Sequence, residues 1–289
     1  MEHHPINIRT AVADIHAALL QYPHESKKHR RLVLLHGAGV AGELTWTFIA
    51  NYLSEWDEVL IPDLPGMGAS KFIGHKPWPV VADYVEAIRE LLVALDWDCF
   101  DIAGYSFGGL VTADLLGDFT IGHCFLIEPA MLFSGDAVEL RQRGEEYIRV
   151  AEHIAEAPDD SVPFFEFLDL VSPHRLKRGR ADEITVQRLM GESQGFAQAL
   201  HAVSDALLRG AGIFTRWMPK VSGASFVGEL SYASMHGRHR LLAENANDWT
   251  YYAVPNADHS LVFMKPRWIA RHMNERVSSE GGVADQPAP

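Results

Sequence analysis

The chain has 289 residues, of which 47% are hydrophobic and 22% are charged, so it has apolar material for one large domain with an insertion or for two small domains. Its 38 acidic and 25 basic residues give a formal net charge of −13, which disfavours nucleic acid and anionic membrane surfaces as partners. No secretion signal opens the chain and no apolar run is long enough to span a bilayer, so a cytoplasmic protein is expected.

Apolar runs of strand length alternate along the chain with segments whose apolar residues have helical spacing. This alternation predicts an α/β fold in which helices cover a parallel sheet. Strands, some with their following turn, are expected within residues 31–37, 58–66, 100–104, 123–129, 224–230 and 250–255. Helices are expected within residues 42–53, 80–95, 107–116 and 265–277.

Strand signals disappear in residues 131–219, where helical spacing and breakers such as APDDSVP at 157–163 replace them. We therefore expect a helical cap inserted between the two parts of one core, residues 1–130 and 220–278. Residues 279–289 contain Gly, Pro and small polar residues with little apolar surface, which predicts a disordered tail.

Neither a metal nor a cofactor is expected. Cys99 and Cys124 both lie in apolar, strand-like runs, where a cysteine is usually a small buried side chain. The chain has no CxxC or HExxH pattern to hold zinc. His3 and His4 are expected to belong to a frayed end of the chain and not to a metal site.

The segment FDIAGYSFGGL at residues 100–110 places Ser106 between glycines, directly after a predicted strand. A sharp strand-to-helix turn requires strained dihedrals, and side chains beside the serine would collide with the neighbouring strand, so glycine is needed at Gly104 and Gly108. The turn would expose the Ser106 hydroxyl at the carboxyl edge of the sheet, beside the positive end of a helix. This position suits a nucleophile.

Residues 104–108, GYSFG, match the GxSxG motif, and at this point the chain resembles the α/β-hydrolase superfamily. Three further motifs of that superfamily occur in its order: HGAG at 36–39, DLPGMGAS at 63–70 and ADHS at 257–260. The resemblance covers roughly residues 5–130 and 220–277. It implies a mostly parallel central sheet flanked by helices, with the helical cap inserted after the sixth strand.

The resemblance implies that Ser106 is a nucleophile and His259 its base. His259 is distinguished among 15 histidines by its place in a loop between the last strand and the closing helix. The oxyanion donors implied are the backbone N–H groups of Ala38 and Phe107. His36 is expected to be structural and to hold the oxyanion loop through a side-chain hydrogen bond.

The acid of the triad is less sharply defined. The usual aspartate position after the seventh strand falls in Gly228-Glu229-Leu230-Ser231, where serine replaces the carboxylate. Some small bacterial esterases of the superfamily place the acid after the sixth strand and carry a GxxSxY pattern, as residues 228–232 do. Glu128 occupies that alternative place, and a charge at this edge needs a partner such as His259. Glu128 is therefore the expected acid; Glu229 is the alternative, and a purely structural Glu128 stays open.

Two segments of the insertion bear on the substrate. The aromatic side chains of residues 162–171 and 215–221 either select an apolar acyl or alcohol group of a small molecule or form the core of the insertion itself. The basic segment HRLKRGR at 174–180 is expected to be a solvated face, and attraction of a carboxylate or phosphate on the substrate is the alternative.

The sequence thus predicts a serine hydrolase that cleaves a carboxylic ester or related acyl compound through an acyl-serine intermediate. Carbon–carbon bond or lactone hydrolysis is open to the same residues. A ligand-binding receptor and a cofactor-independent oxygenase, in which His259 and Glu128 form a base dyad and Ser106 positions the substrate, are the alternatives from other classes. Serine at position 106 argues against haloalkane dehalogenase and epoxide hydrolase chemistry, since enzymes of similar fold use aspartate there.

Overall fold

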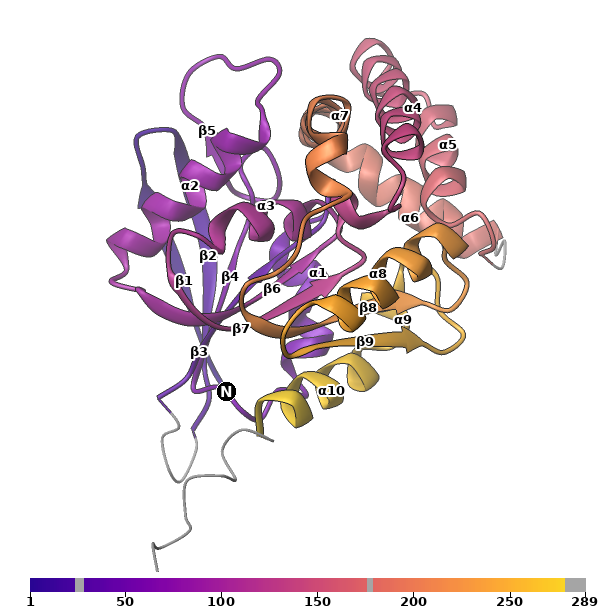
Figure 1. Cartoon of the computed structure of the whole chain (residues 1–289). Coiled ribbons are helices and arrows are strands. Elements are labelled where there is room, and N and C mark those ends of the chain that lie inside the picture. Colours follow the sequence, from indigo (N-terminus) through magenta and orange to yellow (C-terminus); the bar gives the residue numbers. More distant parts are fainter. Residues whose placement is uncertain (24–28, 176–178, 279–289) are drawn as a thin grey trace, which may run out of the picture.

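The computed structural model describes residues 1–23, 29–175 and 179–278. Within them a nine-stranded sheet has the order β1-β2-β4-β3-β6-β7-β8-β9, and the short β5 pairs with β2 (Figure 1). The strands are β1 (Glu2–Arg9), β2 (Ala13–Gln21), β3 (Arg31–Leu35), β4 (Glu58–Pro62), β5 (Lys71–Phe72), β6 (Cys99–Tyr105), β7 (Thr120–Ile127), β8 (Ser222–Gly228) and β9 (Trp249–Val254). The pairs that involve β2 are antiparallel, and the ladder from β4 to β9 is parallel throughout.

Helices cover both faces of this sheet and also form the segment between β7 and β8. The helices around the sheet are α1 (Gly42–Ala50), α2 (Val81–Ala94), α3 (Phe107–Leu115), α8 (Ala233–Asn245), α9 (Leu261–Met264) and α10 (Pro266–Ser278). The segment between β7 and β8 contains the 3₁₀ turn η1 (Ala130–Leu132) and then α4 (Ala137–Glu156), α5 (Val162–Val171), α6 (Gly179–Gly191) and α7 (Ser193–Phe214). The mostly parallel sheet with its helical insertion confirms the α/β-hydrolase fold expected from the motifs.

The central strands are buried on both faces, which explains their continuous apolar runs. In β3, Val33 and Leu35 belong to the buried cluster beneath α2 and α3. Leu32 and Leu34, which point to the opposite face, belong to a second cluster beneath α1 and α10. Because its side chains are buried on both faces of the sheet, such a strand does not alternate apolar and polar residues. In the sequence it is recognised by its length and by the turns at its ends.

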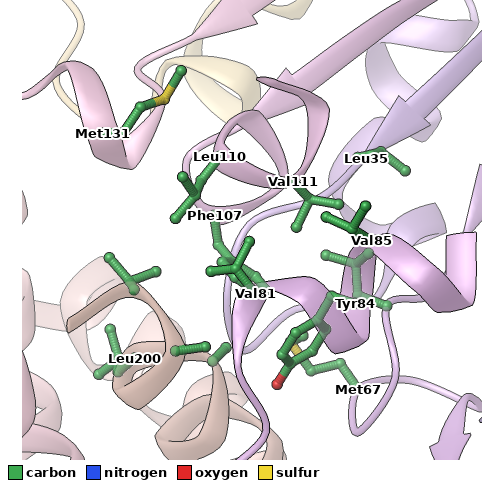
Figure 2. Packing of buried hydrophobic residues seen from close by; sticks show 14 of the residues in the cluster. Leu35, Met67, Val81, Tyr84, Val85, Phe107, Leu110, Val111, Met131 and Leu200 are labelled. Carbon is green, nitrogen blue, oxygen red and sulfur yellow. The ribbon is translucent and has the colours of Figure 1, made fainter. Parts of the chain in front are cut away.

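The helical insertion shares one of these clusters with the sheet. Phe107 at the start of α3 packs edge-to-face on Tyr84 of α2, with ring centroids 4.8 Å apart, and Leu200 of α7 belongs to the same cluster (Figure 2). Tyr147 of α4 also belongs to it. Continuous apolar packing therefore holds α4 and α7 against the turn that contains Ser106.

The strands of the first 21 residues were not among those expected, and the expectation of a frayed end was wrong. His3 and His4 lie in β1, which pairs with β2, and His3 Nε2 lies 2.7 Å from Glu43 Oε1. The strand sequence EHHPINIR is polar and contains proline, as an edge strand permits. Because β5 is an additional strand, the strand expected as the sixth is β7.

The expectation for the two cysteines holds for one of them. Cys124 is buried in the middle of β7. Cys99 is exposed, so the expectation of a buried thiol was wrong there. Cys99 is the first residue of β6, at the amino end of the strand, and an apolar run alone does not show where burial begins. The expected disordered tail, 279–289, lies outside the described residues.

Candidate active site

Ser106 forms the sharp turn between β6 and α3, with φ of 52° and ψ of −113°. A non-glycine residue rarely adopts a positive φ, and such strained positions occur often at functional sites. Two main-chain hydrogen bonds hold the turn on β7: Ser106 N–H donates to Ile127 O at 2.9 Å, and Ala130 N–H donates to Ser106 O at 3.0 Å. The turn is therefore fixed by the neighbouring strand and the residues that follow it.

The glycines beside Ser106 are required by close main-chain approach. A Cβ atom on Gly108 would lie 2.3 Å from Leu35 O at the end of β3. On Gly104 it would lie 2.5 Å from Gly108 O and 2.3 Å from the Thr112 side chain of α3. The predicted collision with the neighbouring strand applies to Gly108, whereas at Gly104 the following helix leaves no room.

His259 joins Ser106 to Glu128. Its Nε2 lies 3.1 Å from Ser106 Oγ, and its Nδ1 lies 2.7 Å from Glu128 Oε2. A carboxylate only accepts hydrogen bonds, so Nδ1 carries the proton in this pair and Nε2 is left to accept the serine proton. The three residues come from the ends of β6 and β7 and from the loop after β9, far apart in sequence.

Glu128 is 1% exposed and has φ of 42°, a second strained residue at this edge. Besides the His259 contact, its Oε1 accepts hydrogen bonds from Gly228 N–H at 2.7 Å and from the Ser231 hydroxyl. Its own N–H donates to Phe226 O of β8 at 3.0 Å. The Gly228 and Ser231 donors stabilise the buried Glu128 carboxylate, whose charge would otherwise be costly to remove from water.

Glu229, the alternative acid, is exposed, and its Oε2 accepts a hydrogen bond from Asn256 N–H at 2.8 Å. The structure thus brings Glu128 to His259 and leaves Glu229 at the rim. Ser231 lies at the position where the resemblance led us to expect aspartate, and its hydroxyl donates to Glu128. The GxxSxY pattern was visible in the sequence, but this role of its serine was not foreseen.

Tyr105, the residue before the nucleophile position, holds the histidine loop. Its hydroxyl donates to His259 O at 2.8 Å. Burial raises the pKa of Tyr105 well above its usual value, and the nearby charges of Glu128 and Asp258 add to this effect. The phenol therefore stays protonated and able to donate. No sequence signal distinguished Tyr105 from a core aromatic residue.

The loop after β3 is held by His36, as expected. His36 Nε2 accepts from Leu64 N–H at 2.8 Å, which leaves Nδ1 to donate to Gly37 O at 2.7 Å. Burial lowers the pKa of His36, although Asp63 and the Gly37 carbonyl act in the opposite direction. A neutral imidazole fits both hydrogen bonds, because a protonated Nε2 has no lone pair for Leu64.

The two main-chain donors expected for an oxyanion both line a cavity beside Ser106. Ala38 N–H has no hydrogen-bond acceptor among the described residues. Phe107 N–H belongs to the first turn of α3, where amides have no partner within the helix. Both amides are therefore available to an oxygen atom of a ligand.

Ser106 and His259 line two small adjacent cavities, of about 30 Å³ and 60 Å³. The larger is lined by Val40, Leu189 and Phe263; the smaller extends beneath the insertion to Arg143 and Tyr147. Phe167 of α5 lines both.

The other residues predicted in the insertion have structural roles. Phe164 is fully buried and packs on Phe196 of α7, with ring centroids 5.8 Å apart. In the basic segment expected to be solvated, His174 and Arg180 are exposed, but Arg175 is a buried side chain whose Nη1 lies 2.6 Å from Asp169 and whose Nε lies 3.2 Å from Asp182. Residues 176–178 of that segment lie outside the described residues.

A model described as the alpha/beta hydrolase family matches residues 32–272. The chain belongs to this family and is an α/β hydrolase. No curated protein sequence matches it significantly.

Several solved structures have similar folds. A candidate epoxide hydrolase from Pseudomonas aeruginosa has a TM-score of 0.72 at 18% identity, with 96% of both chains covered. A thermophilic esterase from Thermogutta terrifontis has a TM-score of 0.71 at 16% identity over 96% of this chain and 99% of the other. An enol-lactonase from Burkholderia xenovorans has a TM-score of 0.69 at 17% identity over 93% and 99%. Likeness at this level of identity shows a shared fold, which hosts many chemistries.

In the described parts of the chain, no helix has the length and apolar character needed to cross a membrane. Nor does that part of the chain bring together three or more His, Cys, Asp or Glu side chains as a metal site.

Proposed function

We propose that the protein is a serine hydrolase that cleaves a carboxylic ester, or a related acyl compound, of a small molecule. The observation that carries this proposal is the contact chain from Ser106 Oγ through His259 to the buried Glu128. Such a chain supplies a nucleophile, a base and a group that stabilises the protonated base. The family membership supplies the reaction class, hydrolysis.

In the first half-reaction, the substrate carbonyl carbon lies against Ser106 Oγ and its oxygen faces the amides of Ala38 and Phe107. Oγ attacks the carbon while His259 Nε2 takes the hydroxyl proton, and Glu128 stabilises the resulting imidazolium. The tetrahedral oxyanion is stabilised by the two N–H groups. When the C–O bond breaks, His259 returns the proton to the leaving alcohol, and an acyl-serine is left.

In the second half-reaction, water replaces the alcohol. His259 removes a proton from the water as the hydroxide oxygen attacks the acyl carbon, and then protonates Ser106 Oγ as it leaves. The products are a carboxylic acid and free enzyme. The same steps open a lactone, in which acid and alcohol remain in one molecule.

The neighbours include a candidate epoxide hydrolase, but the residue at the β6–α3 turn favours acyl transfer. An epoxide opened by a carboxylate at that turn gives an ester that water can hydrolyse, whereas a serine would give an ether that this apparatus does not cleave. Ser106 therefore supports ester chemistry.

A fluorophosphonate probe tests the proposal. It should label wild-type protein in a 1:1 ratio at Ser106, and Ser106→Ala should lose labelling together with roughly 10⁴- to 10⁶-fold of its esterase turnover. Ser134→Ala, at a buried serine that does not line the cavity, is the matched control and should keep both. A folded wild-type protein that is neither labelled nor active on a panel of esters, lactones and vinylogous diketones would refute the proposal in favour of a binding or oxygenase role.

A further inference from the structure

The cavity that contains Ser106 also contains a buried cation. Arg143 of α4 is 5% exposed and lines the same cavity as Ser106 and His259. Charged side chains are rarely this buried unless they are paired, because removal from water costs several kcal/mol. Apart from Glu128, which contacts His259, the other lining residues are largely apolar, such as Phe133 and Leu200. Arg143 therefore stands out as the cation of this cavity.

The contacts of Arg143 are chiefly with aromatic rings. The guanidinium carbon lies 4.2 Å from the ring centroid of Phe133, 5.0 Å from that of Tyr232 and 5.5 Å from that of Tyr147. Its Nη1 donates to Leu170 O. Rings and a carbonyl hold the guanidinium in place and stabilise its charge without neutralising it.

One carboxylate lies near this cation. Glu146, one turn further along α4, has its Oε2 3.1 Å from Arg143 Nε, but Nε is not aligned for a hydrogen bond to it or to any other described residue. The Glu146 side chain is 22% exposed, so water competes for it. Burial disfavours the charge of Arg143, but Tyr147, Tyr232 and Glu146 outweigh this, so the pKa of Arg143 is raised and the side chain stays a cation.

The second cavity has a different character. It shares Ser106, His259 and Phe167 with the first, and no Arg, Lys, Asp or Glu is found among its described lining residues. Both cavities are partly open to solvent. Ser106 therefore lies between a cavity with a cation and an apolar cavity.

The geometry points to a substrate class: we propose that Arg143 binds a carboxylate on the acyl part of the substrate, which makes the protein an esterase for half-esters of dicarboxylic acids with an apolar alcohol. This inference rests on the proposed acyl-serine chemistry. The acyl part is assigned to the cavity of Arg143, and the apolar alcohol to the second cavity, which has no charged residue among its described lining residues. A guanidinium pairs with a carboxylate better than any other side chain does, since its planar donors match the two oxygens.

The test compares monoethyl succinate, glutarate and adipate with uncharged ethyl alkanoates of matched length, by ethanol release. Wild type should have a kcat/KM at least about tenfold higher on the best half-ester. Arg143→Met should lower kcat/KM on that half-ester by about 10- to 100-fold, chiefly through KM, and leave the uncharged esters within a few-fold. Arg143→Lys, which keeps the charge, should recover part of the preference.

Arg238→Met is the matched control. Arg238 is 3% exposed, its Nη2 donates to Phe214 O and Trp217 O, and it does not line the cavity. This variant should lose stability without changing the ratio of rates on half-esters and uncharged esters. All rates are divided by the fraction of protein that the fluorophosphonate labels, so a poorly folded variant does not imitate a specificity change.

Three results would overturn the inference: a wild type that prefers the uncharged esters, an Arg143→Met variant that loses both substrate types equally, or a loss confined to 4-acetoxybenzoate, whose carboxylate is on the alcohol side. None of these outcomes affects the proposed function, provided that Ser106 is labelled. Absence of labelling in wild type would instead refute the proposed function itself.

Discussion

Two regions meet at Ser106, and they hold their residues by different means. At the carboxyl edge of the sheet, Ser106 and Glu128 have positive φ values of 52° and 42°, and main-chain hydrogen bonds to adjacent strands fix both. In the insertion, Phe167 is held on a regular helix by apolar packing, and Arg143 on another by aromatic rings and the Leu170 carbonyl. The sheet edge should therefore tolerate almost no change near its main chain, whereas the insertion should tolerate change wherever packing leaves room.

The sheet edge and the insertion would also play different parts in the proposed reaction. The groups that we propose react lie at or just after strand ends, which parallel strands bring to one edge of the sheet. Residues of α4, α5 and α7 line the rest of the cavity, where we propose that the substrate binds. A change at the edge should therefore affect the rate on every substrate, and a change in the insertion should affect the choice among substrates.

The largest expected effect distinguishes two glutamates that follow adjacent strands. Glu128→Gln removes the charge that stabilises protonated His259, and turnover on any accepted ester should fall by about 10⁴-fold. Glu229→Gln should stay close to wild type, because its carboxylate contacts Asn256 N–H in an exposed loop. Turnover numbers of both variants check this, and a large loss in Glu229→Gln alone would show that the acid is misassigned.

The next effect compares two glycines that both lie within helices. Gly108→Ala in α3 places a methyl group 2.3 Å from Leu35 O and should destabilise the protein by roughly 3 kcal/mol. Gly212→Ala in α7 meets no atom within 4 Å and should stabilise by roughly 0.5–1 kcal/mol through helix propensity. Urea unfolding curves measure both. Equal effects of the same sign would show that the two regions do not differ as described.

The smallest effect concerns acid stability. Burial, with Arg238 and His236, lowers the pKa of His239 on α8 to about 3, so the folded protein holds this imidazole neutral. Above the unfolded pKa of about 6.5, protonation of His239 does not reduce the free energy of unfolding. Below that pH the free energy of unfolding falls by about 1.4 kcal/mol per pH unit, which amounts to about 2 kcal/mol at pH 5. The lowered pKa of His36 acts in the same direction.

His239→Phe should therefore flatten the fall in unfolding free energy between pH 7 and pH 5. The matched control is His153→Gln in α4, whose side chain is 41% exposed and which should leave the curve close to that of wild type. If the two variants give the same curve, burial of His239 is not the cause of the acid lability.

The sequence predicted those parts of the site that depend on local chain geometry. Gly104 and Gly108 around a serine, directly after an apolar run, require a sharp turn. The order of the motifs predicted the strand ends on which His36 and His259 lie. The local sequence did not predict β1, whose polar residues reflect its place at the edge of the sheet. It also did not predict the exposure of Cys99, which is the first residue of β6.

The roles of single polar residues were harder to predict. Ser231 and Tyr105 act through partners 103 and 154 residues away in the chain, Glu128 and His259. A local pattern does not contain a contact of that separation. Arg143 gave no signal, because in the sequence it is one of several charged residues on a helix, and only packing shows that it points into the cavity of Ser106.

By itself the sequence determined the layered fold and the sharp turn at Ser106, because strand length, helical spacing and glycine are properties of neighbouring residues. Only the tertiary structure decided which glutamate contacts His259 and which arginine faces Ser106, because both depend on how strands and helices distant in sequence are brought together and buried.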